Sequence, residues 1–333
     1  MFNLFKRNKK AGVILMYHRI NTAVSDTWQL CVSPECFAEQ MEVLKKFRVI
    51  SLQQAVKDIS KKEVQPDSVV ITFDDGYLDN FTSAKSILEK HKYPTTFFIT
   101  NASQQMNREY WWDQLEYILL ENTNLPGEIK IALGENSYRW DLQDGWQQII
   151  SEDDMKDFAS WLPWQEPPTT QHALFIYLSE WIKSLSYPEQ TEVIDQLFKQ
   201  CGKGMEVRDK YRVMNSDKLK ELSNSAGFEI GGHSAWHTAL GKFDEETQYK
   251  AIQDNKIYLE RTVNKSIAGY GFAHGSYNQT SVKLLRKAGF SYACTTEEAV
   301  FTEASNPLAL PRFQVKNIEG SIFKKQLENW FKI

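Results

Sequence analysis

A chain of 333 residues can hold one large domain or two of ordinary size, and its content of 42% hydrophobic and 25% charged residues is typical of a folded protein. The net charge of −4, without a dominant basic region, argues against nucleic acid as the main partner. No stretch approaches the ~20 consecutive apolar residues that a membrane-spanning helix requires.

The first ten residues carry four cations and a few apolar side chains. The apolar run that follows them, over residues 12–17, is shorter than the ~7–15 residues of a signal-peptide core and lacks a small-residue cleavage site. The four cysteines show no CxxC spacing and indicate reduced thiols, so we expect a cytoplasmic protein. Phe2, Leu4 and Phe5 beside the cations could rest on an anionic inner membrane leaflet, although a solvated tail is the simpler expectation.

Strands and helices alternate over the first hundred residues. A buried strand predicted at 13–17 is followed at once by His18. A helix is predicted after Ser33, because a serine N-cap and a proline in the first helical position precede an apolar face. A short strand near 49–50 and a helix from Ser51 follow. Alternation at this spacing predicts a parallel sheet with helices outside it.

The stretch over residues 68–77 is the most informative part of the chain. Its first six residues predict a strand buried on both faces, and the strand ends in Asp74, Asp75 and Gly76. A turn at the glycine can bring both carboxylates into one cleft. Two buried like charges require a metal ion or an arginine nearby, unless one aspartate only caps the helix that follows.

A helix through 84–88 and a strand at 95–99 continue the alternation, which then stops. Residues from about 101 to 211 hold seven of the ten tryptophans. The elements predicted there are two helices and a hairpin, at 112–120, 175–185 and 128–140. Tryptophan faces stack on sugar rings, which would suit a lid over a substrate. The alternative, which we favour, is that these side chains build a small core for the insertion itself.

The alternation resumes after the insertion and continues to the C-terminus. Helices are predicted at 217–225, 245–263, 281–288 and 323–331. Strands are predicted before His233 and at 267–272, 290–294 and 308–315, which makes seven or eight strands in all. His18, Asp74, Asp75, His233 and His274 each lie at the C-terminal end of a predicted strand, where barrel enzymes carry their active sites.

His233 and His237 are four positions apart. On a helical turn this spacing puts both imidazoles on one face, within reach of one ion. Two histidines and one carboxylate leave coordination positions open for water and substrate, as a catalytic metal site requires. Either feature alone arises by chance, so the histidine pair and the Asp-Asp-Gly strand end predict a metal centre only in combination.

Residues 72–76 (TFDDG) and 233–237 (HSAWH) resemble the first two motifs of the NodB-type polysaccharide deacetylases, the fourth carbohydrate esterase family. Further segments that carry the resemblance are 15–19, 94–99, 275–278 and 310–312. The resemblance implies an α/β fold, namely a distorted (β/α) barrel of seven or eight strands. This barrel would form one domain over residues 1–333, with the mostly helical insertion at about 101–211.

The resemblance also implies a reaction, the hydrolysis of N-acetyl groups on amino sugars with one divalent metal ion. Zinc is the first candidate, and cobalt, nickel and manganese are others. The metal ligands would be Asp75, His233 and His237. Asp74 would accept the proton of the attacking water, and a backbone N–H near Gly275 or Ser276 would help to stabilise the oxyanion.

The chain departs from the family pattern in two places. Many members supply a histidine from a Leu-x-His motif near the C-terminus, and this chain has none there. His18 and His274 are the remaining candidates to protonate the leaving amine, because an ordinary pKa of about 6.5 suits that task. The usual arginine of the third motif has no match in residues 270–275, so Arg312 is our candidate to orient and charge-balance Asp74.

The leading hypothesis is a metal-dependent hydrolase that removes the N-acetyl group from an amino sugar. The sugar would belong to a polysaccharide, a glycolipid or, given the expected cytoplasmic location, a lipid-linked precursor. Two alternatives remain, a catalytically silent carbohydrate-binding barrel, which the two departures suggest, and a sugar deformylase on the same fold.

Overall fold

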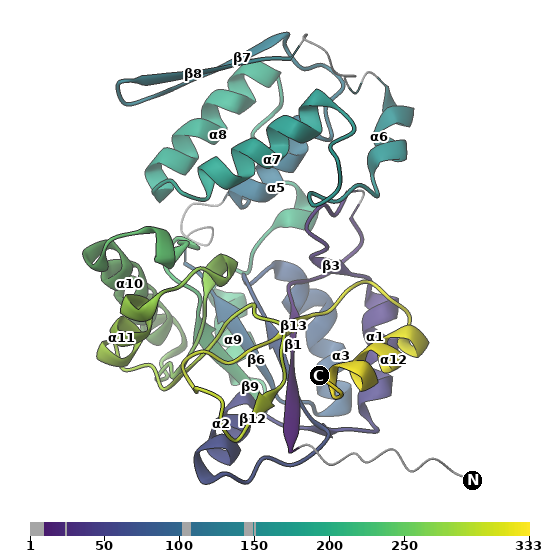
Figure 1. Ribbon diagram of the computed structural model, residues 1–333, viewed down its shortest axis with the longest axis vertical. Coiled ribbons are helices and arrows are strands. Elements are labelled where there is room, and N and C mark those ends of the chain that lie inside the picture. The colour runs from purple at the N-terminus through teal and green to yellow at the C-terminus, as the bar shows by residue number, and fades with distance from the viewer. Residues whose placement is uncertain (1–9, 24, 102–107, 143–148, 150) are drawn as a thin grey trace. The chain divides into compact units, whose positions relative to one another are not determined.

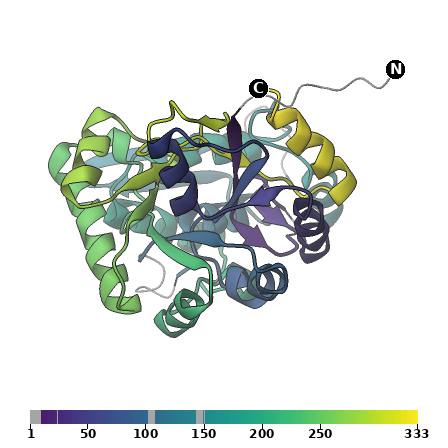
Figure 2. The same cartoon turned by 90° about the horizontal axis from the view of Figure 1, so that it is seen from below.

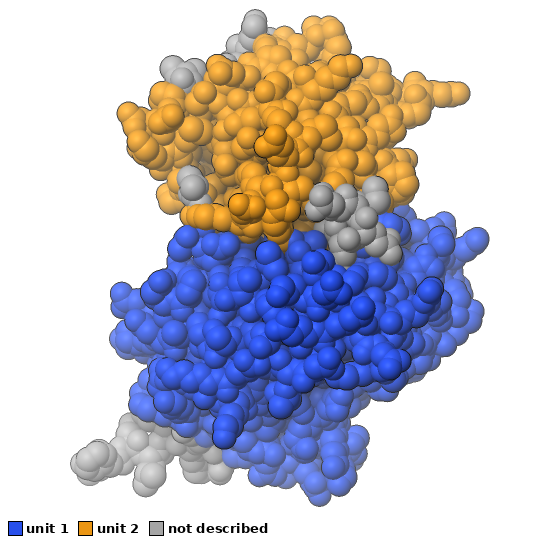
Figure 3. Space-filling view, turned by 180° about the vertical axis from the view of Figure 1, so that it is seen from behind, with its two compact units in different colours: residues 1–22, 31–105, 213–333 blue, residues 23–30, 106–212 orange. Residues whose placement is uncertain are grey.

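The computed structural model describes residues 10–23, 25–101, 108–142, 149 and 151–333. Phe2, Leu4 and Phe5 lie outside these residues, so the cytoplasmic location and the membrane contact stay predictions. The chain divides into two compact units, which Figure 3 distinguishes by colour. Unit 1 comprises residues 1–22, 31–105 and 213–333, and unit 2 comprises residues 23–30 and 106–212. Within the described part of the chain, no helix is long and apolar enough to cross a membrane.

Unit 1 is built on one nine-stranded sheet in the order β11-β10-β9-β6-β5-β1-β12, with β4 beside β5 and β13 beside β1 (Figure 1). The strands are β1 (Ala11–Tyr17), β4 (Arg48–Val49), β5 (Ser68–Phe73), β6 (Thr95–Ile99), β9 (Phe228–Gly232), β10 (Gly269–Gly271), β11 (Tyr292–Cys294), β12 (Phe301–Thr302) and β13 (Phe313–Gln314). Every pair is parallel except β12 with β1. The sheet is curled, with helices around its outside (Figure 2), which confirms the predicted (β/α) barrel class.

The two ends of the sheet are connected by the segment 307–315. Beside β11, Leu310 N donates to Ala293 O at 2.8 Å, and a few residues later β13 pairs with β1. The segment predicted as one strand at 308–315 is therefore regular only at its end. The prediction missed β12, because two residues are too few to show a periodic pattern. Two further short strands, β2 (Arg19–Ile20) and β3 (Cys31–Val32), form a separate parallel pair.

Unit 1 contains seven α-helices among its described residues, and the first begins at the N-cap that the sequence predicts. They are α1 (Pro34–Leu44), α2 (Leu52–Lys61), α3 (Lys85–His91), α9 (Ser216–Asn224), α10 (Glu245–Val263), α11 (Gln279–Lys287) and α12 (Gly320–Trp330). Ser33 accepts a hydrogen bond from Cys36 N at 3.2 Å, and Ser51 accepts one from Gln54 N at 3.1 Å, so both serines are N-caps. A π-helical turn at Asn80–Ala84, which the sequence did not predict, precedes α3.

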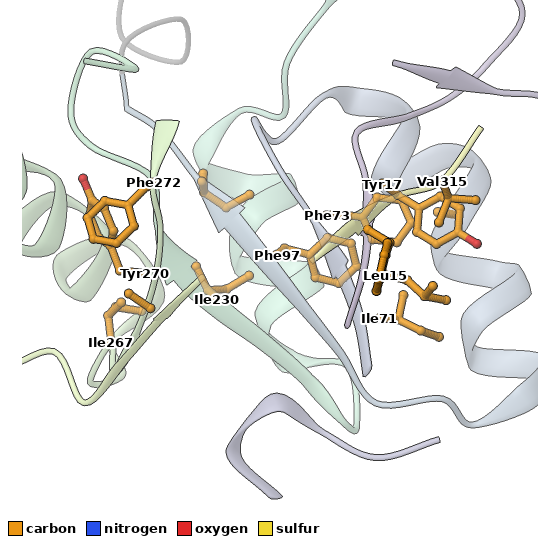
Figure 4. Packing of buried hydrophobic residues seen from close by; sticks show 14 of the residues in the cluster. Leu15, Tyr17, Ile71, Phe73, Phe97, Ile230, Ile267, Tyr270, Phe272 and Val315 are labelled. Carbon is orange, nitrogen blue, oxygen red and sulfur yellow. The ribbon is translucent and has the colours of Figure 1, made fainter. Parts of the chain in front are cut away.

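Aromatic packing fixes the strand ends that lead into the candidate site. The Phe73 ring stacks on Phe97 at 5.2 Å between centroids and on Tyr17 at 5.3 Å, and all three side chains are buried. Figure 4 shows these rings beside Leu15 and Ile71. The residues that follow Tyr17 and Phe73 are therefore held at the same edge of the sheet, where β1 and β5 pair in register.

Unit 2 contains α5 (Trp111–Leu119), the hairpin β7 (Glu128–Leu133) and β8 (Asn136–Asp141), α6 (Glu152–Phe158), α7 (Thr170–Ile182) and α8 (Tyr187–Cys201). The sequence predicted the hairpin and the helices α5 and α7, and missed α6 and α8. Unit 2 has its own hydrophobic core, which includes Leu115, Phe175, Leu178, Ile194 and Leu197.

The tryptophans of the insertion mostly serve this core. Trp112 and Trp161 are buried, while Trp111, Trp140 and Trp181 are partly buried and the last three pack against the core cluster. Trp164 is the exception among the described tryptophans, at 64% exposed. This packing favours the core interpretation over a lid for most of these side chains.

Candidate metal centre

Asp74 and Asp75 follow β5 directly, and the chain reverses there. Asp75 has a φ of 71° and Gly76 a φ of 82°, both in the left-handed region, so the turn begins one residue before the glycine. Asp74 N donates to Tyr17 O at 2.9 Å, which continues the pairing of β5 with β1. At Gly76 a Cβ would approach the side chain of Ile99 to 2.9 Å, so a glycine suits both the conformation and the space. Both carboxylates are buried, at 2% and 3% exposed.

His233 and His237 both lie close to Asp75, but the backbone between them does not have the predicted helical conformation. Residues 233–237 do not form a helical turn, because Ser234 and His237 have φ values of 62° and 51°. Ser234 Oγ accepts a hydrogen bond from Thr238 N at 2.7 Å and so holds this irregular turn. The Nε2 atoms of His233 and His237 lie 3.3 and 3.2 Å from Asp75 Oδ1. The helical-turn prediction was wrong, yet the spacing still brings both imidazoles to one carboxylate.

Hydrogen bonds orient the His233 side chain and its backbone. The Nδ1 atom lies 2.7 Å from Gly271 O, and a carbonyl oxygen only accepts, so Nδ1 carries a proton. When the ring is neutral, this leaves the lone pair of Nε2 to bind a metal ion. The backbone N–H of His233 donates to Asn255 Oδ1 at 2.9 Å, and Asn255 Nδ2 donates to Ile99 O at 3.0 Å. Asn255 thereby ties helix α10 to the ends of β6 and β9.

Asp75, His233 and His237 suit a divalent metal ion. One ligand atom from each lies within 4.8 Å of the others, and all three residues are buried. Burial alone would raise the pKa of Asp75, but its contacts with His237 and His233 lower that pKa well below the usual value, so the carboxylate is ionised. Two imidazole nitrogens and one carboxylate oxygen form a donor set that zinc and related metals accept, with coordination positions left open.

Asp74 lies beside these residues and pairs with Arg312. The guanidinium is bidentate, with Nη1 2.7 Å from Oδ1 and Nη2 2.8 Å from Oδ2. Arg312 is fully buried and also donates to Thr295 O and Thr72 Oγ1. Burial alone would raise the pKa of Asp74, and the charges of Arg312 and His233 outweigh it and lower the pKa. Arg312 immediately precedes β13, whereas the sequence predicted it within a strand over 308–315, so that prediction is corrected.

His18 is also close to the carboxylates. It follows Tyr17, whose register partner is Phe73, so His18 and Asp74 leave neighbouring strands at the same level. Burial lowers the pKa of His18, and the charges of Asp75 and Asp74 raise it only in part. The residue as a whole is half-buried. His18 is thus placed near the proposed centre without being one of its three ligands.

His274 lies against His237 rather than against the carboxylates. Its Nε2 is 3.0 Å from Nδ1 of His237, with ring centroids 4.2 Å apart. The amides of Gly275 and Ser276 donate to Phe272 O and Ala273 O within a 3-10 turn. These two N–H groups are therefore engaged inside the turn, and the oxyanion role expected near them is not supported by their geometry.

The sequence analysis missed Asn255 and Thr72 as residues that support the site. Asn255 is fully buried among Ala251, Ile252 and Leu259 on the inner face of α10. An asparagine on a mostly apolar helix face was a detectable feature, because a buried amide needs hydrogen-bond partners. Thr72 lay within the motif itself, but nothing in the strand pattern indicated an arginine partner.

Comparisons with known proteins agree with this fold. A sequence model of the family described as polysaccharide deacetylase matches residues 61–125 and 177–293, together more than half of the chain. A putative polysaccharide deacetylase, YxkH of Bacillus subtilis, is 23% identical over 117 residues. The poly-beta-1,6-N-acetyl-D-glucosamine N-deacetylase of Staphylococcus aureus strain MRSA252 is 24% identical over 126 residues. Each match spans 35% of this chain and 42% of the relative.

Two solved structures share the fold over nearly the whole chain. The Streptococcus pyogenes deacetylase PplD in complex with acetate has a TM-score of 0.59 at 16% identity, covering 95% of this chain and 98% of that one. IcaB from Ammonifex degensii has a TM-score of 0.56 at 15% identity, covering 97% of each chain. The likeness in structure, the family match and the two motifs agree, and the chain belongs to the polysaccharide deacetylase family.

Proposed function

We propose that this protein is a metal-dependent hydrolase that removes the N-acetyl group from an amino sugar of a glycan. The observation that carries the proposal is the placement of two differently partnered aspartates at the end of β5. Asp75 faces two imidazoles, and Asp74 faces a buried arginine. The similarity to relatives that include an N-deacetylase of a poly-N-acetylglucosamine supports the same reaction.

The ligands of the ion would be Asp75, His233 and His237. Zinc is the first candidate for this donor set, and cobalt, nickel and manganese are compatible with it. A divalent ion bound there would polarise the amide carbonyl and lower the pKa of water from 15.7 to about 7. The three side chains contribute one negative charge, so the site would keep a net positive charge with the ion present, which favours an amide oxygen and a water molecule.

Asp74 is suited to accept the proton of the attacking water. Its lowered pKa keeps it ionised near neutral pH, and an ionised carboxylate can take up a proton. The bidentate contact with Arg312 uses one lone pair on each oxygen and fixes the plane of the carboxylate. The remaining lone pairs can accept a hydrogen bond from water.

The leaving amine needs a proton before it departs. His18 is our candidate donor, because it lies close enough for Asp75 and Asp74 to affect its pKa and is partly exposed. A neutral His18 would first have to take up a proton, and the carboxylate that has just accepted one is the nearest source. This assignment predicts that His18→Ala keeps metal binding and slows the reaction.

The deciding experiment measures acetate and formate release from a panel of acetylated and formylated amino sugars, in free, polymeric and lipid-linked forms, with and without a chelator. We expect acetate release that stops on chelation and returns when Zn²⁺ or Co²⁺ is added. Formate without acetate would identify a deformylase. Sugar binding without either product would identify a carbohydrate-binding barrel. The polymeric and lipid-linked arms test which form of the sugar is the substrate.

A further inference from the structure

Both histidines of the proposed metal centre are held at Nδ1 by one short stretch, residues 271–274, that begins with the last residue of β10. Gly271 O lies 2.7 Å from Nδ1 of His233. Three residues later, Nε2 of His274 lies 3.0 Å from Nδ1 of His237. One segment of the chain thus provides a hydrogen-bond partner to each imidazole on the side that faces away from Asp75.

The chemistry of imidazole decides the direction of the second hydrogen bond. A neutral imidazole carries its proton on one nitrogen and offers the lone pair of the other. His237 approaches Asp75 through Nε2, so binding a metal ion there leaves its proton on Nδ1. Nδ1 must then donate, and Nε2 of His274 must accept. With Nε2 as an acceptor, His274 is a neutral imidazole whose proton is on Nδ1, and a neutral imidazole is a far weaker acid than the imidazolium that a leaving amine would need as its proton donor.

We propose that His274 is a positioning residue that orients His237 for the metal ion, and that it is not the proton donor of the reaction. The inference rests on the metal site of the proposed function. Histidines that bind metals are regularly oriented by a partner on their other ring nitrogen, and loss of such a partner weakens metal binding. Here the partner is a second imidazole instead of the more usual carboxylate or carbonyl.

The backbone around His274 holds it in this position. His274 has a φ of 54° and Gly275 a φ of 63°, so two successive residues are in the left-handed region. At Gly275 a Cβ would overlap Thr296 Oγ1, at 1.9 Å, so the turn packs tightly against the segment after β11. The conformation that turns the His274 ring toward His237 is therefore held by the packing of Gly275 against Thr296.

Close packing also requires a glycine at position 271, beside the ring of His233. A Cβ at this position would lie 2.9 Å from the ring of Phe98 and 3.0 Å from Nδ1 of His233. Only glycine lets the backbone carbonyl approach the His233 ring this closely. Gly271→Ala should displace that imidazole and weaken metal binding independently of His274.

The test measures Zn²⁺ affinity of the metal-stripped full chain by competition with a chromogenic chelator, without any substrate. The variants are His274→Ala, which removes the acceptor, and His274→Gln, whose amide oxygen can replace it. Ser276→Ala is the matched control, since it ends the same turn and, among the described residues, its side chain makes no hydrogen bond to either imidazole. We expect His274→Ala to raise the Zn²⁺ dissociation constant roughly 10- to 100-fold. His274→Gln should recover much of this loss, and Ser276→Ala should leave the constant unchanged.

An unchanged dissociation constant in His274→Ala would overturn the inference, and if acetate release were lost at the same time His274 would be the proton donor after all. A lower melting temperature of metal-free His274→Ala would point to a folding defect, and the comparison would then rest on His274→Gln. The d–d absorption of the Co²⁺-loaded protein provides a second readout, which should change in His274→Ala and not in Ser276→Ala. Failure of the unaltered protein to bind any of the candidate metals would instead reject the proposed function.

Discussion

Asp74 and Asp75 are neighbours in sequence but have different partners. Asp74 is paired with a guanidinium over two short hydrogen bonds, whereas Asp75 faces two imidazole nitrogens. Because Asp75 adopts a left-handed φ of 71°, its side chain leaves the strand pattern, and both carboxylates lie beside Nε2 of His233. The different surroundings suit Asp75 to bind a metal ion and Asp74 to accept a proton.

Asp74→Asn should separate these two roles. The amide keeps the size of the side chain but cannot take up a proton, so we expect acetate release to fall roughly 10²- to 10⁴-fold. Metal content, measured by elemental analysis, should stay close to that of the unaltered protein. His237→Ala is the counterpart, and it should lower metal occupancy. Full activity in Asp74→Asn would reject Asp74 as the base, and unchanged stoichiometry in His237→Ala would remove His237 from the ligands.

Arg312→Met should destabilise unit 1, because it leaves the carboxylate of Asp74 buried without its cation. Removing one partner of a buried ion pair typically costs about 3–5 kcal/mol. Combining it with Asp74→Asn removes the uncompensated charge, so the double variant should be more stable than the sum of the two single effects predicts. Urea unfolding of the metal-free protein, followed by circular dichroism, measures all three. Strictly additive losses would show that the pair is not coupled.

At the scale of elements, the outer edge of the β7–β8 hairpin is covered by two glutamines of α8. Gln200 bonds both the N–H and the C=O of Lys130, and Gln196 does the same for Ala132, at 2.6 to 2.9 Å. The spacing of four residues puts both glutamines on one face of the helix. The helix thus supplies the hydrogen bonds that an additional strand would make, and it protects the strand edge from pairing with another chain.

Replacing Gln196 and Gln200 together by alanine should lower the stability of unit 2. Each glutamine makes two hydrogen bonds, and a typical net contribution is about 0.5–1.5 kcal/mol per bond, reduced here by exposure to solvent. We therefore expect a loss on the order of 1–3 kcal/mol in the double variant. Lys199→Ala, at an exposed position of the same helix, is the control. Equal urea midpoints for the double variant and the control would contradict this account of α8.

At the scale of the whole molecule, the two units have separate hydrophobic cores and can respond differently to pH. His172 is buried in the core region of unit 2, where its Nδ1 lies 2.7 Å from Thr169 Oγ1 and its ring contacts Trp161. Burial lowers the pKa of His172 to about 4. The unfolded chain should have the ordinary value of about 6.5.

This difference predicts that acid destabilises unit 2. Between pH about 6.5 and about 4 only the unfolded state binds the proton of His172, so stability falls as the pH falls through that window and levels off below it. The full effect is at most about 3 kcal/mol, at about 1.4 kcal/mol for each pKa unit. Eight of the ten tryptophans belong to residues 23–30 and 106–212, so tryptophan fluorescence follows the unfolding of this unit.

His172→Gln is the variant that tests the assignment, because it removes the titrating group and keeps a side chain able to bond Thr169. The difference in unfolding free energy between pH 7 and pH 4.5 should be smaller in this variant than in the unaltered protein. Comparing the two proteins cancels the contributions of all other titrating groups. The same pH dependence in both would show that His172 is not the cause.

The sequence alone determined the elements that have a local pattern. The barrel class followed from the resemblance of the motifs to the deacetylase family. The buried strands that end at Tyr17 and Phe73, the N-cap Ser33 and the helix that begins after Ser51 followed from periodicity and capping residues. Each of these depends on residues close together in the chain, and a short window contains the information. The separation of four residues between His233 and His237 was also visible, although its interpretation as a helical turn was wrong.

Only the tertiary structure decided which distant residues meet. Arg312 was a candidate partner of Asp74 on the sequence, but the two residues are 238 positions apart and only the structure shows that they pair. His274 was one of two candidate proton donors on the sequence, and only the structure shows that its ring lies against His237, beyond the left-handed turn that follows β10. Contacts of this kind depend on how strands and turns pack around one another, and the spacing of residues along a single segment does not contain that information.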